Sequence, residues 1–249
     1  MRRGGQNKRF LVKQFSNQPV TKHLNMQRPY KHIDATEIQG FEKVFRANLI
    51  NSLSGLKPAN LIGTTSQDGQ TNLAIFSSVI HLGADPALLG FIQRPLGEQS
   101  HTYKNIKETG YYTINHIQEH IVEQAHYTAA RFSREESEFE ACCLTPEYLA
   151  QFHAPFVQES LVKIGMRFKQ EIPLTINNTI LMIGQIEHVF LPEHVVLDKG
   201  NLALDETAAV CVSGLDTYYR VSKLAQFPYS KTTNLPNFSQ KSDRNSPKR

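Results

Sequence analysis

The sequence lacks the short motifs that mark several common classes of enzyme. It contains no P-loop, no Gly-x-Gly-x-x-Gly and no Gly-x-Ser-x-Gly pattern. These motifs hold nucleotide phosphates or a nucleophilic serine, so their absence leaves a P-loop kinase, a Rossmann dehydrogenase and a serine hydrolase with little support.

Long apolar runs are also absent. A membrane-spanning helix needs roughly 18 consecutive apolar residues, and no run approaches that length. The basic N-terminus has no apolar segment of the kind that a secretory signal requires. We therefore expect a protein that does not associate with a membrane.

Cysteine is scarce, with only Cys142, Cys143 and Cys211. An odd number that includes an adjacent pair does not form a disulfide framework, which favours a reducing compartment such as the cytoplasm. The adjacent pair could act in redox chemistry, but we expect both residues to be buried as small apolar side chains.

Acidic residues are nearly missing from both ends. Residues 1–32 carry eight basic and no acidic residues, and residues 227–249 carry five basic residues and one acid. Since the whole chain has a net charge of +4, residues 33–226 carry −8. A folded region with excess acid is a poor nucleic-acid binder, because phosphate affinity depends on clustered Lys and Arg.

The composition divides the chain into three parts. Residues 1–32 are polar and aperiodic and are interpreted as a disordered basic arm; a transit peptide, or a natural start at Met26, is the alternative. Residues 33–225 are predicted to form the folded domain. Residues 226–249 are rich in Ser, Asn, Pro and Lys and are predicted to be a disordered tail.

Most of the folded part shows strand patterns. Strands are predicted over 60–66, 71–83, 87–93, 110–117, 161–174, 179–191 and 208–215. Asp68-Gly69 between two apolar runs predicts a hairpin with a type I′ turn. The hairpins dominate over β-α-β alternation, so the fold class is mainly β, an antiparallel β-barrel with peripheral helices.

Helical patterns are fewer and shorter. They cover 101–109, 118–132 and 145–152, the last with Thr145 as N-cap and Pro146 at the first helical position. We expect these helices to cover the openings of the barrel.

The strand predicted over 71–82 has small and hydroxyl-bearing residues on both faces. Its period of two places Thr71, Leu73 and Ser77 on one face and Asn72 and Ser78 on the other. The pattern fits a wall against a planar ligand, read by the main chain and by short side chains. An ordinary central strand with tolerated serines is the alternative.

The stretch 92–110 indicates a phosphate site without a glycine loop. Arg94 leaves the end of a strand before Pro95, and Thr102 is predicted to cap a helix that ends at Gly110. A helix N-terminus, an arginine and the hydroxyls of Ser100 and Thr102 would together hold a phosphate monoester. An exposed arginine beside an ordinary capped helix is the alternative.

Histidines raise the question of a metal site. His116 and His120 have helical i, i+4 spacing, but no His-Glu-x-x-His motif is present and no third ligand is evident. We therefore predict no metal.

Taken in order, the segments 59–95, 101–115, 137–148, 180–189 and 214–221 resemble the flavin reductase-like family of FMN-binding split-barrel proteins. The resemblance implies an antiparallel split barrel of the Greek-key type, a homodimer, and FMN bound near the dimer interface. It also implies which residues bind FMN. Those matching the ring-binding strand and the phosphate element are Asn72, Ala74, Phe76, Ser77, Ser78, Arg94, Ser100, His101 and Thr102.

The same resemblance assigns the segment of Tyr218, Tyr219 and Arg220 to the neighbourhood of the flavin or of the partner subunit. His101 departs from the family pattern, in which relatives often carry an acid. No catalytic side chain is expected, because hydride transfer from a nicotinamide to a flavin requires no protein acid or base.

The leading hypothesis is an NAD(P)H:flavin oxidoreductase that passes reduced FMN or its electrons to an oxygenase or another redox partner. An FMN-containing electron carrier reduced by a basic protein partner is the alternative. A third hypothesis is an interaction protein whose basic ends bind nucleic acid or an anionic surface.

Overall fold

The computed structural model of the protein describes residues 30–98 and 100–236. Residues 30–41 and 42–236 belong to separate compact units. Most of the predicted arm 1–32 lies outside the described residues, and the predicted tail 226–249 is described only as far as residue 236. Among the described residues, no helix is both long enough and apolar enough to cross a membrane.

The first unit contains helix α1 (Ala35–Gly40), which begins with a capping box. The backbone nitrogen of Glu37 donates to the Asp34 carboxylate at 2.9 Å, and the Glu37 carboxylate accepts from the Asp34 backbone at 3.3 Å. These two bonds satisfy donors that a helix start would otherwise leave unpaired.

The second unit is mainly β. Its main sheet has seven strands in the order β3-β2-β6-β9-β10-β5-β4, all paired antiparallel. The strands are β2 (Asn60–Thr65), β3 (Thr71–Phe76), β4 (Ile80–Ala84), β5 (Ala87–Gln93), β6 (Tyr111–His116), β9 (Lys163–Leu174) and β10 (Thr179–Phe190).

Smaller elements surround this sheet. A second sheet has the order β1-β11-β12, and β7 pairs with β8. These strands are β1 (Lys57–Pro58), β7 (Pro146–Glu147), β8 (Phe156–Val157), β11 (Val210–Ser213) and β12 (Thr217–Arg220). The α-helices are α2 (Lys43–Leu53), α3 (His101–Thr109), α4 (Val122–Tyr127) and α5 (Glu138–Ala141), with short 3₁₀ turns at Glu119–Ile121, Glu193–Val195, Leu204–Thr207 and Thr232–Asn234.

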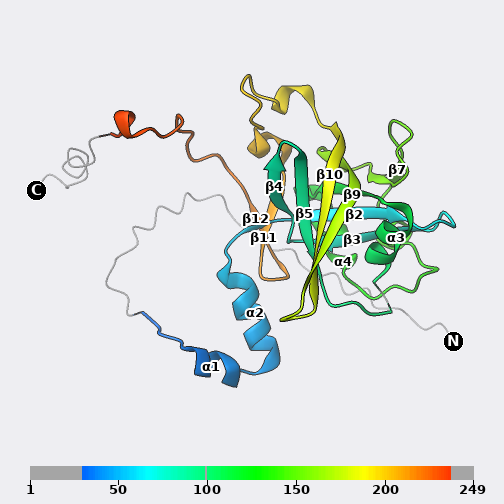
Figure 1. Ribbon diagram of the computed structural model, residues 1–249, viewed down its shortest axis with the longest axis horizontal. Coiled ribbons are helices and arrows are strands. Elements are labelled where there is room, and N and C mark those ends of the chain that lie inside the picture. Colours follow the sequence, from blue (N-terminus) through cyan, green and yellow to red (C-terminus); the bar gives the residue numbers. More distant parts are fainter. Residues whose placement is uncertain (1–29, 99, 237–249) are drawn as a thin grey trace, which may run out of the picture. The chain divides into compact units, whose positions relative to one another are not determined.

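The main sheet must curl into a barrel because its two edge strands are consecutive in the chain. Across a flat sheet, β3 and β4 would lie about 29 Å apart, at about 4.8 Å per strand spacing. Only residues 77–79 join them, and the chain from Phe76 to Ile80 spans at most about 14 Å. In Figure 1, β2 and β3 run across the direction of β5 and β10, as this closure requires.

Two hydrophobic clusters lie on opposite faces of the barrel wall. Ile62, Phe91 and Tyr112 belong to one cluster, into which α3 inserts Ile106. The neighbouring residue Leu61 belongs to the other, which α4, α5 and β11 cover. Burial on both faces agrees with the fact that all six residues of β2 are buried.

The main strands confirm the predicted mainly β fold, but several local predictions were wrong. Residues 71–82 do not form one strand, because the chain bends at Ser77 as it crosses from one barrel edge to the other. The hairpin at Asp68-Gly69 is present, but only Gly69 has a positive φ, +85°. A three-residue loop with a left-handed glycine therefore replaces the predicted type I′ turn.

The helix predicted over 145–152 is absent. Pro146 and Glu147 instead form β7, and Ala150 and Gln151 have positive φ angles of 49° and 56°. Pairing with β8 provides backbone hydrogen bonds that outweigh the local helix-start signal.

The predicted helix over 118–132 is shorter than expected, because a 3₁₀ turn precedes α4, which ends at Tyr127. Cys142 is buried as predicted, but Cys143 is exposed, with a φ of 54°.

Candidate functional site

Two buried hydrogen bonds fasten α3 to the barrel. The side-chain amide of Asn72 on β3 donates to the Thr102 hydroxyl at 3.0 Å, and the Asn105 amide donates to the Thr64 hydroxyl at 3.1 Å. All four residues are buried, so each bond also satisfies polar atoms that water does not reach. These contacts hold the start of α3 beside the start of β3.

The start of α3 differs from the prediction. Ser100, and not Thr102, is the N-cap residue, and the helix begins at His101. The Ser100 hydroxyl accepts from the backbone nitrogen of Gly97 at 2.9 Å. No described side chain caps the first-turn N–H groups, so they are available to an external acceptor. At the other end, Gly110 closes the helix in the left-handed region at φ 77°, as predicted.

The start of α3 also has charged neighbours of both signs. Burial lowers the pKa of His101, and the neighbouring cations Lys104 and Arg134 lower that pKa further, whereas Glu135 raises it. Arg134 and His101 line a shallow depression that also includes Asn72. The side chain of Arg94 is exposed and has no hydrogen-bond or ion-pair partner within the described part of the chain.

Lys104 and Arg134 were missed by the sequence analysis. Lys104 follows Ser100 by one helical turn, and this spacing could have indicated it. Arg134 lies in the segment between α4 and α5, and only the tertiary structure brings it to α3.

The residues predicted to bind the flavin ring have structural contacts of their own. The Ser78 hydroxyl donates to the Ile92 carbonyl at 3.2 Å and accepts from the Ile92 backbone nitrogen at 3.1 Å, which ties the bend after β3 to β5. The ring of Phe76 packs edge-on against Phe91, with 4.9 Å between centroids. Ser77 and Ala74 are partly buried.

The outer edge of β3 offers main-chain groups as well. The backbone nitrogen of Leu73 points away from β2 and donates to the Glu138 carboxylate at 2.9 Å. Burial raises the pKa of Glu138. Because N–H directions alternate along a strand, the N–H group of Ile75 faces the same edge. This edge can therefore hydrogen-bond a flat group placed alongside the strand.

The segment Tyr218 to Arg220 packs locally. The Tyr218 hydroxyl lies 3.0 Å from Nδ1 of His126, and Arg220 forms an ion pair with Glu119 at 2.6 Å. Tyr219 is exposed. These contacts attach β12 to the region around α4.

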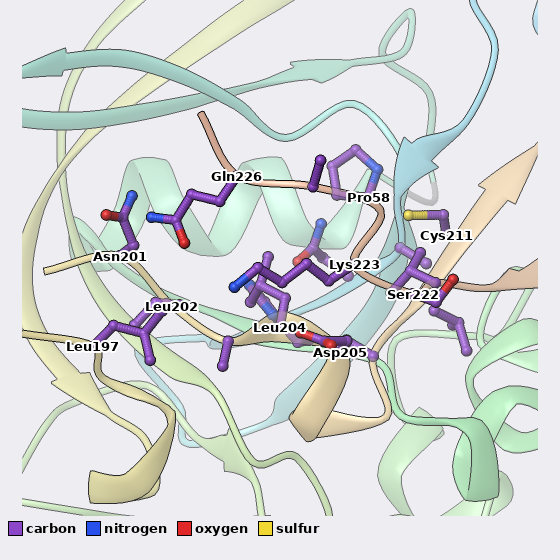
Figure 2. Close-up of a pocket in the computed structure, with 18 residues that line it drawn as sticks. Pro58, Leu197, Asn201, Leu202, Leu204, Asp205, Cys211, Ser222, Lys223 and Gln226 are labelled. Atoms are coloured by element: carbon purple, nitrogen blue, oxygen red, sulfur yellow. The ribbon is translucent and has the colours of Figure 1, made fainter. Parts of the chain in front are cut away.

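A cavity of about 400 Å³ lies beside residues 58–60, where β2 begins. Its walls come from residues 58–60, residues 197–205, the start of β11 and residues 221–226 (Figure 2). Burial lowers the pKa of His116 in its wall to about 4, so this side chain is neutral at physiological pH.

Residues 55–206 match the family described as the flavin reductase like domain. The chain belongs to the flavin reductase-like family. The match covers the whole seven-stranded barrel of the protein together with α3.

Solved structures and curated sequences are also similar to this chain. A protein of Shewanella frigidimarina, assigned as a flavin reductase with a split barrel domain, is 49% identical, with a TM-score of 0.78 over 81% of this chain and 100% of that chain. Component B of nitrilotriacetate monooxygenase from Bacillus cereus has a TM-score of 0.69 at 22% identity, over 80% of this chain and 100% of that chain. The uncharacterized protein YwrF of Bacillus subtilis is 29% identical over 156 residues, which are 60% of this chain and 76% of that protein.

Membership of the flavin reductase-like family indicates a flavin-related function and suggests oxidoreductase activity. Within this fold, the sequence-predicted residues divide into two groups. Asn72 and Thr102 lie together and join β3 to α3. Arg94 and His101 keep polar atoms that can contact a ligand, and no described contact joins Arg94 to the others.

Proposed function

We propose that the protein binds FMN and catalyses its reduction by NAD(P)H. The observation that carries this proposal is the start of α3, where N–H groups that no described side chain caps are held next to the outer edge of β3. The family and the name of the Shewanella protein support a flavin as the ligand of such a site.

The residues present fit both the phosphate and the flavin ring of FMN. Within the described residues the Arg94 side chain has no hydrogen-bond or ion-pair partner, so it can pair with a phosphate, as the first-turn N–H groups of α3 can. The first turn of α3 itself contains no acidic residue, and its charged neighbours are the cations Lys104 and Arg134 together with Glu135. The outer edge of β3 would hydrogen-bond the polar rim of the flavin ring.

The bound flavin would supply the redox chemistry by accepting a hydride from the nicotinamide. The chain's own residues would bind and orient it. Asn72 and Thr102 would act as positioning residues, because their bond sets the distance between the phosphate end at α3 and the ring end at β3. No side-chain acid or base is assigned to the reaction.

We also propose a cytoplasmic homodimer that delivers reduced flavin or electrons to an oxygenase or other redox partner. Apolar side chains exposed on α2 and on edge strand β4 support a partner subunit, among them Val44, Leu53 and Ile80. Three unpaired cysteines support a reducing compartment.

The experiment is purification of the full chain, followed by its absorbance spectrum and anaerobic titration with NADH or NADPH. We expect a flavin spectrum that extraction identifies as FMN, and bleaching of that spectrum by one of the two nucleotides. A protein that binds no flavin, even when FMN is added, would refute the proposal.

The net charge of −8 on residues 33–226 favours a second candidate, an FMN electron carrier reduced by a basic protein. This candidate predicts that neither nucleotide bleaches the bound flavin until a partner reductase is added. Direct bleaching by NADH or NADPH would exclude it.

A further inference from the structure

The cavity of about 400 Å³ has the size of a small-molecule site. Figure 2 shows Leu202, Leu204 and Asp205 from the segment before β11, and Lys223 and Gln226 from the C-terminal segment, around the cavity. Leu202 and Leu204 are 36% and 42% exposed, so they present apolar surface that the described residues do not cover. Apolar side chains that face an open cavity are expected where an apolar ligand binds.

The interior of this cavity carries no net charge. Among the described residues that line it, the basic and acidic side chains are His116, Lys223 and Asp205. Lys223 and Asp205 are both exposed and have opposite charges. The buried His116 imidazole stays neutral. A charged ligand would lose its hydration here without a compensating partner, so an uncharged ligand is favoured.

One hydrogen-bond donor in the cavity wall lacks a partner. Asn60 is 1% exposed, and its side-chain nitrogen makes no hydrogen bond within the described residues. A buried N–H group without an acceptor is costly, and a ligand carbonyl could supply that acceptor after a small rotation of the side chain.

The cavity shares no lining residue with the depression at the start of α3. Part of its wall, residues 209–211, 221–223 and 225–226, lies beyond the matched residues 55–206. Asn60 is the cross-strand neighbour of Phe76. The cavity therefore begins beside the C-terminal end of the strand proposed to hold the flavin ring.

We propose that this cavity binds an uncharged, mainly apolar organic compound that carries a carbonyl group, as a second ligand beside the flavin. The position beside the flavin rests on the proposed function, whereas the chemistry of the ligand rests on the cavity alone. The C-terminal segment 221–226 forms one wall and thereby determines which compounds fit.

The test compares three probes of similar shape by calorimetry on the full chain. The ketone α-tetralone is expected to bind, whereas tetralin lacks the carbonyl and tetralin carboxylate carries a charge. We expect each of the other two to bind about tenfold more weakly than the ketone.

Two tryptophan variants on the same segment localise the binding. Ala225 lines the cavity, and Leu224 is 99% exposed and does not line it. Ala225→Trp should weaken α-tetralone binding by about tenfold or more, and Leu224→Trp should leave it within about twofold. Both positions are exposed, so the variants should keep the unfolding midpoint of the wild type.

Titrations with and without FMN separate this inference from the proposed function. Binding of α-tetralone with the expected selectivity to a protein that takes up no FMN would sustain the inference and reject the proposed function. Absence of α-tetralone binding, equal loss in both tryptophan variants, or displacement of α-tetralone by FMN would overturn the inference.

Discussion

The hydrogen bond between Asn72 and Thr102 provides the sharpest test of how the site is built. The family resemblance implies that Asn72 binds the flavin. In the structure the Asn72 amide instead donates a hydrogen bond to the Thr102 hydroxyl at 3.0 Å, and both residues are 6% exposed. Asn72→Ala removes the donor, and Thr102→Val removes the acceptor at nearly constant shape. Each single change leaves a buried polar atom without its partner, so each should lower the free energy of unfolding by about 1–3 kcal/mol.

The double variant removes both polar groups and leaves neither atom unpaired. Its loss should be smaller than the sum of the two single losses by about 1 kcal/mol. Urea unfolding of flavin-free protein, followed by far-UV circular dichroism because the chain has no tryptophan, measures all four proteins. Asn201→Ala is the control, since this asparagine is exposed and should change stability by less than about 0.5 kcal/mol.

Additive losses in that cycle would refute the link between β3 and α3. Single variants with unchanged flavin-free stability would assign Asn72 to the ligand alone. In either case the site would not be positioned as proposed.

Three further changes test other parts of the structure. Arg94→Ala should weaken FMN binding by about 1.5–3 kcal/mol with the fold intact, as measured by fluorescence titration. The control is Lys169→Ala, which removes an exposed lysine on β9. Equal weakening by both variants would remove Arg94 from the site. His116 has a folded pKa of about 4, so below about pH 6.5 the unfolded chain binds a proton that the native state does not. The free energy of unfolding should therefore fall by at most about 3 kcal/mol as the pH drops from 6.5 to 4. Urea unfolding of the His116→Gln variant should show a smaller fall, and a pH profile identical to that of the wild type would contradict this. Gly184→Ala would place a methyl group against the buried Tyr112 hydroxyl and should cost about 1–3 kcal/mol in urea unfolding, so an unchanged midpoint would refute that packing.

Local patterns predicted much of the fold correctly. The hairpin at Asp68-Gly69 and the closure of α3 by Gly110 depend on backbone angles that few residue types allow, so neighbouring residues identify them. The alternation along 163–174 likewise marks a half-buried strand, which became β9.

Predictions failed where distant segments compete with local signals. Thr145-Pro146 is a good helix start in isolation, but pairing with β8 makes it a strand. The apolar run 71–82 has no turn signal inside it, yet the chain bends at Ser77 because the barrel has to close there. Thr102 has the side chain of an N-cap, and its hydroxyl is used by Asn72 instead.

The sequence by itself determined the mainly β fold, because strand alternation and turn chemistry are local properties. The residues around which the flavin site is proposed came from the resemblance to the flavin reductase-like family. Only the tertiary structure decided which of those residues support the site and which can contact a ligand. It also brought Arg134 to α3 and formed the cavity from residues 58–60, 197–211 and 221–226. These segments are far apart in the chain, and hydrogen bonding and apolar burial across the closed barrel bring them together.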